Sequence, residues 1–389
     1  MDQRVAIVSY GLLNYKGPNE LGMWNDEATF AVAKQALEKV GLKKEEIDVV
    51  VIATMDGQDG ITISNGMLVP AAGAYERDSI RIENSTVHCV MSGMTSILSG
   101  NAEVVVVASS DTIEFDYDYI TNANQDPFFR GPLGFNARQG YGLLAMDYLR
   151  KTKATEADFA RVAAKNYLCG SRNRFAHIRN AYSEEEIMAS PRVAWPLRRL
   201  ELSGLSNGAG AFVLASAKKA RELTDSPIWI TGIAAATNSY LGSWAELSSQ
   251  KALKTAAKKS YQMAGIKDPG KELDFMEIFN PFSAYELIAY EALGICAEGK
   301  GRDLLREGVT YPDGDLPVNL SGGSLCTNGP NSSGVFRVIQ AAMLLRNEAL
   351  GDDLGNLGNL RRGLVHDGDV GIGAIGGDSH AVMILEREG

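Results

Sequence analysis

The chain has 389 residues, of which 45% are hydrophobic and 22% charged, and its formal net charge at pH 7 is −10. This composition is typical of a globular protein with a sizeable core, and the negative charge argues against a general nucleic-acid-binding surface. The four cysteines form no CxxC pair, so we expect neither a disulfide framework nor a bound metal. No apolar run reaches the roughly 18–20 residues that a bilayer requires, and no leader-like segment precedes the first strand-like run. We therefore expect a cytoplasmic protein without membrane contact.

The first half of the chain alternates short β-branched runs with helical patterns, which indicates α/β layering. The expected elements are strands at 5–8 and 48–52 around a helix at 27–40, a strand–helix–strand unit from 79 to 107, a helix at 156–167 and a strand at 208–214. The segment at about 111–198 is rich in Tyr, Phe, Asn and Arg and interrupts this order. We interpret it as a long insertion.

The second half repeats the same order. The expected elements are strands at 227–232, 275–279 and 381–385, and helices at 245–264, 284–293 and 334–346. This repetition predicts a duplicated α/β unit, with one half at 1–220 and the other at 221–389. Continuous apolar strands such as Val104 to Val107 are typical of a sheet buried on both faces.

The junction before the helix near residue 85 is a candidate reactive site. The first N–H groups of a helix lack partners within the helix, so they lower the pKa of a nearby thiol and hold an anion. Cys89 is either that nucleophile or a helix residue one turn further in. His88 is a poor catalytic partner for it, because adjacent helix residues do not face each other.

Several stretches resemble a known family: MEIFNPFSAYEL at 276–287, YEALGIC at 290–296, LPVNLSGG at 316–323 and SNGAGA at 206–211. With the order of elements, they make the chain similar to the thiolase superfamily over essentially its whole length, above all to the lipid-transfer-protein (sterol-carrier-protein) branch. The resemblance implies a five-layered αβαβα fold, a dimer of thiolase-like chains and an acyl-CoA substrate that carries coenzyme A. It also implies a small zinc-ribbon/OB-fold partner subunit.

The chain departs from the family at the place of the nucleophile. Counting back without a gap from Gly100 puts Asn84 there, followed by Ser85 and Thr86. Only a gap that shortens the helix makes Cys89 the nucleophile. The string CVMSG, which begins at Cys89, is similar to the family's Cys-x-Ser-Gly and favours that gap.

The other catalytic places also differ. Gly329 stands where the family's loop histidine should be, and Ala374 replaces a second cysteine. Phe279 occupies the family's His/Asn place, with Asn280 beside it. Claisen chemistry needs a thiolate, a base and donors for two oxyanions. Without the gap, the usual places supply neither nucleophile nor base.

The candidates for catalysis are Cys89, His380, Asn328 and Asn280. His380 follows a Gly-Gly turn that faces the reaction centre in the family. There a neutral imidazole would suit proton transfer near pH 7; the alternative is that it caps the next strand. Asn328 belongs to a donor-rich loop that either holds a thioester oxyanion or is simply a tight turn. A further alternative, implied by the resemblance, is that tyrosines act as the acid–base groups, as in thiolase-like aldolases: Tyr117, Tyr119, Tyr141 and Tyr285.

The candidates for binding coenzyme A are Arg174, His177, Ser206 and Gly323. We expect His366 at the surface in a polar turn. The aromatic residues of the insertion either line an acyl pocket or pack the insertion against the core. The glycine-rich stretches lack the spacing of a dinucleotide fingerprint, so no nucleotide cofactor is expected.

The sequence predicts chemistry on a CoA thioester, in which a C–C bond beta to the thioester is made or cleaved. The reaction would be acyl transfer if Cys89 is the nucleophile or if an active thiolase subunit is paired with this chain, and retro-aldol cleavage if no thiolate takes part. The remaining hypothesis is a non-catalytic subunit of a heteromeric thiolase, such as a benzoylsuccinyl-CoA thiolase.

Overall fold

The structure is a computed structural model that describes residues 3–83, 85–115, 118–119, 122, 128, 131–238, 244–351, 358–368 and 379–388. Nine strands form one continuous sheet. Their order is β3 (Asp78–Ile82), β2 (Val49–Ala53), β4 (Val104–Asp111), β7 (Gly208–Ser216), β1 (Val5–Leu12), β8 (Ile228–Thr237), β11 (Ser379–Arg387), β10 (Arg362–Gly368) and β9 (Phe275–Ile278). β1 and β8 share two paired positions, and there the part of the sheet from the first half meets the part from the second half.

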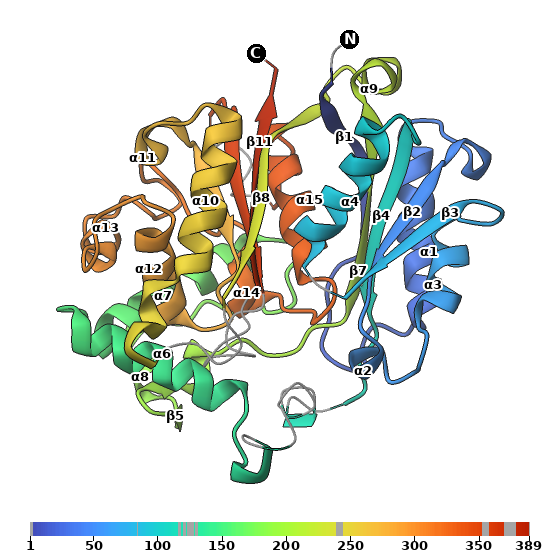
Figure 1. Ribbon diagram of the computed structural model, residues 1–389. Coiled ribbons are helices and arrows are strands. Elements are labelled where there is room, and N and C mark those ends of the chain that lie inside the picture. The colour runs from blue at the N-terminus through green and yellow to red at the C-terminus, as the bar shows by residue number, and fades with distance from the viewer. Residues whose placement is uncertain are drawn as a thin grey trace.

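Helices lie in three layers around the two parts of this sheet (Figure 1). α4 (Thr86–Leu98) and α15 (Ser333–Leu345) contact strands of both parts and form the central layer. The outer face of the first part is covered by α1 (Asn25–Glu38), α3 (Asn65–Ala71) and α9 (Ala217–Leu223). The outer face of the second part is covered by α10 (Lys251–Ala264) and α12 (Ser283–Ala292). The result is the predicted αβαβα layering.

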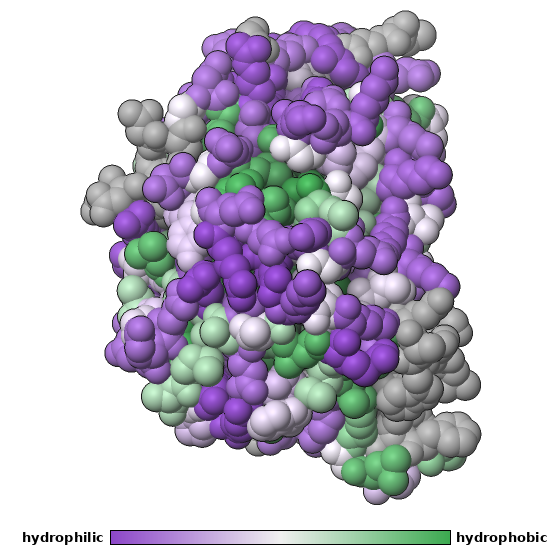
Figure 2. Space-filling view, turned by 90° about the vertical axis from the view of Figure 1, so that its left-hand side faces the viewer, coloured by the Kyte–Doolittle hydropathy of each residue, from purple (hydrophilic) through white to green (hydrophobic). Residues whose placement is uncertain are grey.

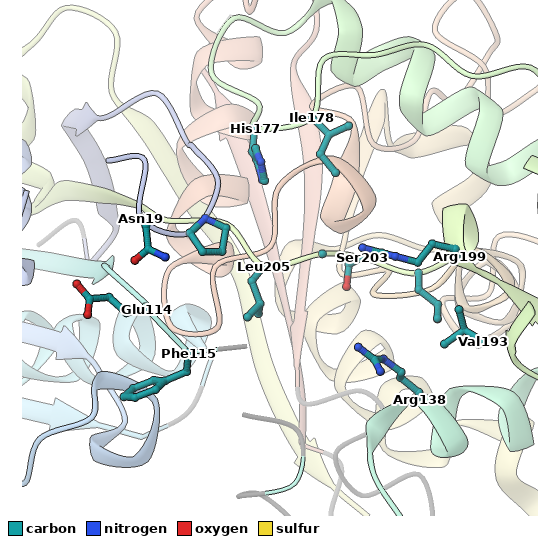
Figure 3. A pocket seen from close by; sticks show the side chains of 13 residues that line it. Asn19, Glu114, Phe115, Arg138, His177, Ile178, Val193, Arg199, Ser203 and Leu205 are labelled. Atoms are coloured by element: carbon teal, nitrogen blue, oxygen red, sulfur yellow. The ribbon is translucent and has the colours of Figure 1, made fainter. Parts of the chain in front are cut away.

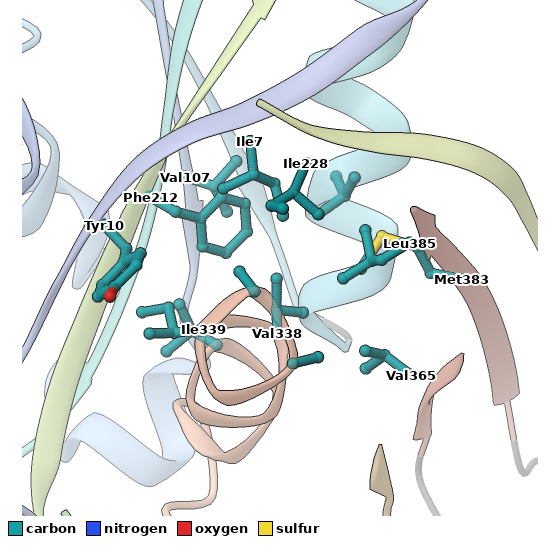
Figure 4. Close-up of a cluster of buried hydrophobic side chains, with 14 of the residues drawn as sticks. Ile7, Tyr10, Val107, Phe212, Ile228, Val338, Ile339, Val365, Met383 and Leu385 are labelled. Carbon is teal, nitrogen blue, oxygen red and sulfur yellow. The ribbon is translucent and has the colours of Figure 1, made fainter. Parts of the chain in front are cut away.

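The strand sequences explain this layering, because successive side chains of a strand point to opposite faces of a sheet. In β4, Val105 and Val107 belong to the central core, whereas Val104 and Val106 belong to the outer core beneath α1. β11 divides its side chains in the same way between the central core and the outer core of the second part. Figure 4 shows the central core packed around α15. Each uninterrupted apolar strand thus contributes side chains to two cores, one on each face of the sheet.

The insertion forms a helical layer at one end of the sheet (Figure 1). It contains α6 (Ala137–Lys151), α7 (Glu156–Arg172), α8 (Glu184–Ala189) and a small hairpin of β5 (Arg192–Ala194) and β6 (Leu197–Arg198). α6 and α7 pack on α12. The remaining short helices are α2 (Asp56–Asp59), α11 (Pro269–Glu272), α13 (Gly301–Arg306), α14 (Gly323–Cys326) and the 3₁₀ helices η1 (Lys44–Glu46), η2 (Gly131–Leu133), η3 (Arg199–Glu201) and η4 (Trp244–Ser249).

Two expectations about elements were wrong. The helix expected at 245–264 is divided, because Gln250 adopts a left-handed φ of 47° between η4 and α10. β10 was not expected, and it carries His366, which is fully buried and not at the surface. Polar residues inside β10 conceal the apolar pattern of a buried strand.

Among the described residues, no helix is both long enough and apolar enough to cross a bilayer. The boundary between the two halves near residue 220 stays a prediction.

Candidate active site

A pocket of about 710 Å³ opens where the insertion meets the loops at the ends of β1 and β4 (Figure 3). Its volume is in the range of small-molecule sites. Its walls combine apolar side chains with a few polar and charged ones. The lining residues are Pro18, Asn19, Glu114, Phe115, Arg138, His177, Ile178, Val193, Arg199, Leu202, Ser203, Gly204 and Leu205.

His177 lines this pocket, and two other predicted residues lie behind it in hydrogen-bond contact. His177 Nδ1 lies 2.9 Å from Ser206 Oγ, and the Asn328 backbone N–H donates to the same oxygen at 3.1 Å. The Asn328 side chain donates to Ser203 Oγ at 3.1 Å. The structure therefore gathers His177, Ser206 and Asn328 into one polar cluster beside the pocket.

Backbone pairing between distant loops holds this cluster in place. Ile178 N–H donates to the Cys326 carbonyl at 3.0 Å, and Ser206 N–H donates to the Asn328 carbonyl at 3.0 Å. His177 is half-buried, and its burial lowers its pKa below the usual value. The imidazole is consequently neutral at pH 7, the form that can accept a proton or donate a neutral hydrogen bond.

Cys89 lies elsewhere. It is fully buried within α4, among the apolar side chains of the central core. Burial, reinforced by the nearby carboxylate of Asp367, raises the pKa of its thiol well above the usual range. The thiol form dominates at pH 7, whereas a nucleophilic cysteine needs the thiolate.

The N-terminus of α4 already holds an internal carboxylate. The backbone N–H of Thr86 donates to Asp367 Oδ2 at 2.8 Å. The other oxygen of Asp367 pairs with the Arg337 guanidinium, and both side chains are at least 95% buried. Arg337 also lies 4.8 Å from the Phe279 ring, at the place where the family has a histidine or asparagine. A buried ion pair therefore lies against the start of α4.

Asn280 and Gly323 belong to a different, fully buried network around Glu286. Glu286 pairs with Lys165 Nζ at 2.6 Å and accepts hydrogen bonds from Asn280 Nδ2 at 3.0 Å and Asn319 Nδ2 at 3.1 Å. Gly323 has a left-handed φ of 60°, and a Cβ there would collide with the side-chain amide of Asn280. The network joins α7, α12 and the 319–324 segment, which gives these two residues a positioning role.

His380 is also buried, away from the residues that line the pocket. Its Nδ1 lies 3.2 Å from His366 Nε2, and Tyr285 stacks on both rings. Burial lowers the pKa of His380 to about 3, so its imidazole stays neutral at physiological pH. Arg174 is exposed and lies over the Phe175 ring at 4.7 Å, also outside the pocket lining.

Sequence reasoning missed Asp111, Arg337 and Asp367. Asp111 ends β4 and accepts backbone N–H bonds from Asn331 at 3.0 Å and Ser332 at 2.8 Å. Burial raises its pKa to about 7. The available signals were a carboxylate at the end of an apolar strand and an arginine inside an apolar helix. Asn84, Tyr117 and Ala374, all named from the sequence, lie outside the described residues. Among the described residues, no group of His, Cys, Asp and Glu side chains could hold a metal ion.

Comparison with known proteins gives the class. The family described as "Thiolase C-terminal domain-like" matches residues 234–387. An acetyl-CoA acetyltransferase of Methanothermobacter thermautotrophicus is 28% identical, over 81% of this chain and 84% of that protein. Sterol carrier protein 2 of Gallus gallus is 26% identical, over 94% of this chain and 70% of that protein.

Two further similarities concern assemblies. The benzoylsuccinyl-CoA thiolase subunit BbsB of Thauera aromatica is 29% identical, over 54% of this chain and 55% of that protein. A solved structure described as an Ltp2-ChsH2(DUF35) aldolase superimposes with a TM-score of 0.81 at 21% identity, and covers 99% of this chain and 98% of that one. At that identity the superposition shows the fold alone.

The fold, the family match and these relatives define a thiolase-like protein of the CoA-related acyltransferase class. Within that class, the chain is similar to the sterol carrier protein 2 branch of the thiolase superfamily. Both agree with the resemblance read from the sequence.

Proposed function

We propose that this protein cleaves or forms a C–C bond beta to a CoA thioester by acid–base chemistry, without a covalent cysteine intermediate. The observation that carries the proposal is the contrast between two sites. Cys89 is a buried thiol in a core, whereas His177 is neutral, lines a pocket and is hydrogen-bonded to Ser206. The coenzyme A part of the substrate would enter through this pocket, and no other cofactor is proposed.

The corresponding reaction is a retro-aldol cleavage. A base takes the proton of the β-hydroxyl group of a β-hydroxyacyl-CoA, and the Cα–Cβ bond breaks. The electron pair of that bond passes into the thioester as an enolate, and Cβ leaves as the carbonyl carbon of an aldehyde or ketone. Protonation of Cα then gives the shortened acyl-CoA. The reverse sequence joins the same two fragments.

Two groups of the polar cluster fit these roles. Hydrogen bonding between Nδ1 of His177 and Ser206 orients the ring, and its neutral form can take the hydroxyl proton. The Asn328 amide uses one N–H on Ser203 and has a second N–H that could stabilise the enolate oxygen. Cys89, Asn280 and His380 then support the fold around the reaction.

The test is to incubate the purified protein with a β-hydroxyacyl-CoA and to follow both products by mass spectrometry. We expect a carbonyl product and a shortened acyl-CoA from wild type and from Cys89→Ala, and strong loss in His177→Gln. Intact-protein mass should show no acyl adduct. An adduct that disappears in Cys89→Ala would contradict the proposal and establish acyl transfer through that thiol.

A second candidate is a non-catalytic subunit of a heteromeric thiolase. It is favoured by the Arg337–Asp367 pair, which occupies the start of α4. In support of an assembly, BbsB is named a subunit and the Ltp2-ChsH2(DUF35) aldolase is a complex. We accordingly propose a dimer of thiolase-like chains with a small zinc-ribbon/OB-fold partner. Activity that resides wholly in the co-purifying chain, and survives His177→Gln, would favour this candidate.

A further inference from the structure

The wall of the pocket contains a cation without a carboxylate partner. Arg199 begins η3 and lines the pocket, and no carboxylate of the described residues pairs with its guanidinium. Two neighbouring arginines behave differently. Arg192 lies 2.8 Å and Arg198 3.6 Å from Glu156 Oε2. Of the three, Arg199 alone is left to face the pocket.

A second arginine lies on the same wall. Figure 3 shows the side chains of Arg138, from α6, and Arg199 on the side of the pocket that also carries Ser203. Arg138 Nη1 is 2.6 Å from Asp118 Oδ1, so its charge is partly balanced. Glu114 lies on the opposite wall. An anion in this pocket would therefore be drawn toward Arg199.

We propose that Arg199, supported by Arg138, binds a carboxylate on the acyl part of the substrate, so that the pocket selects carboxylated acyl-CoA thioesters. A guanidinium presents parallel N–H donors that match a carboxylate. Ser203 connects this wall of the pocket to the place proposed for the thioester, since its hydroxyl oxygen accepts a hydrogen bond from the Asn328 side chain. The inference rests on the proposed function, which places the thioester beside Asn328.

The same chemistry would also recognise a phosphate of coenzyme A. The position of Arg199 favours a carboxylate of the acyl group over a phosphate of coenzyme A, because the phosphates and the thioester lie at opposite ends of the pantetheine arm. A guanidinium close to the Ser203–Asn328 pair is on the thioester side of that arm. The two sources are separable by experiment.

The experiment measures dissociation constants by calorimetry for succinyl-CoA and for butyryl-CoA, which lacks the terminal charge. We expect wild type to bind succinyl-CoA about tenfold or more tightly than butyryl-CoA. Arg199→Gln should bring this ratio close to one and leave butyryl-CoA binding unchanged. Arg192→Gln is the matched control, because it removes the same charge from a residue paired with Glu156, and it should keep the ratio.

Further measurements distinguish binding of a carboxylate from binding of a phosphate, and a specific effect from unfolding of the variant. Both ligands are repeated as 3′-dephospho-CoA thioesters, and thermal unfolding checks that each variant is folded. Arg199→Lys, which keeps the charge, should retain part of the preference if Arg199→Gln unfolds. Equal binding of the two thioesters by wild type would overturn this inference alone. An Arg199→Gln effect that is the same for both thioesters and vanishes with the dephospho forms would assign the arginine to a phosphate. Binding of neither thioester would overturn the proposed function as well.

Discussion

Arg337 and Asp367 form a buried ion pair at the N-terminus of α4, and the free oxygen of Asp367 accepts the backbone N–H of Thr86. The carboxylate satisfies a helix N–H that has no partner within the helix, and the guanidinium balances the carboxylate. Arg337 Nη1 continues the network to Ser324 Oγ at 3.2 Å. The ion pair thereby links the central helices to α14.

Removing one partner of this pair should be costly. We expect Arg337→Met or Asp367→Asn to lower the free energy of unfolding by about 3–5 kcal/mol, because the remaining group is buried without its counter-charge. The double variant Arg337→Met/Asp367→Asn should lose less than the sum of the single variants. Urea unfolding measures all three. Lys34→Met, which breaks an exposed pair with Glu38, should change stability by no more than about 0.5 kcal/mol.

Cys89→Ala should cost stability but not chemistry. The thiol is buried in the central core, so its loss should reduce the free energy of unfolding by about 1 kcal/mol. The value of kcat should stay within about twofold of wild type, since the thiolate takes no part in the proposed reaction. Steady-state kinetics and chemical denaturation on the same preparation separate the two effects. A loss of activity in a folded protein would return Cys89 to the role of nucleophile.

His177→Gln should lower kcat/KM by roughly 100- to 10,000-fold, the usual contribution of a general base. His88→Gln is the control, because His88 is hydrogen-bonded to Ser85 and does not line the pocket. Because burial lowers the pKa of His177, wild-type activity should persist below pH 6.5 and fall only at more acidic pH. An acid limb at or above pH 6.5 would contradict this assignment.

Asp111 should make stability depend on pH. Burial raises its pKa in the folded protein to about 7, from 3.8, so the folded state favours the protonated carboxyl. The stability this contributes is fully present below pH 3.8 and is lost progressively as the pH rises to about 7. Wild type should therefore lose stability relative to Asp111→Asn, which cannot titrate, as the pH rises from 4 to 7. A pH-independent difference would show that this carboxyl has an ordinary pKa.

Gly329→Ala should destabilise the protein by about 1–3 kcal/mol. A Cβ at this position would collide with the Asp111 carboxylate and the Ser332 hydroxyl. Gly329→His should be worse, so the family's loop histidine cannot be restored by one substitution. Melting temperatures of both variants test this, with Gly66→Ala as the control because a Cβ there has room.

The sequence by itself determined the class of fold. Continuous apolar strands such as Val104 to Val107 contribute side chains to two cores, and the motif stretches at 276–287 and 316–323 indicate similarity to the thiolase superfamily. It also named His177, Ser206 and Asn328 as candidate site residues, and their roles stay predictions. Such signals are local or periodic, so they are readable without knowledge of long-range contacts.

Only the tertiary structure decided which of these residues meet. From its position in the sequence, the Cys89 side chain could lie either at a reactive junction or in a core. The packing of α4 buries it in the core. Arg337 and Asp367 are 30 positions apart and lie on different elements, so no local sequence pattern predicts that they form an ion pair. His366 looked like a surface residue because its neighbours are polar, yet β10 lies between β9 and β11. Burial and charge pairing between distant segments are properties of the packed chain, and they set the pKa values and the contacts on which the chemistry depends.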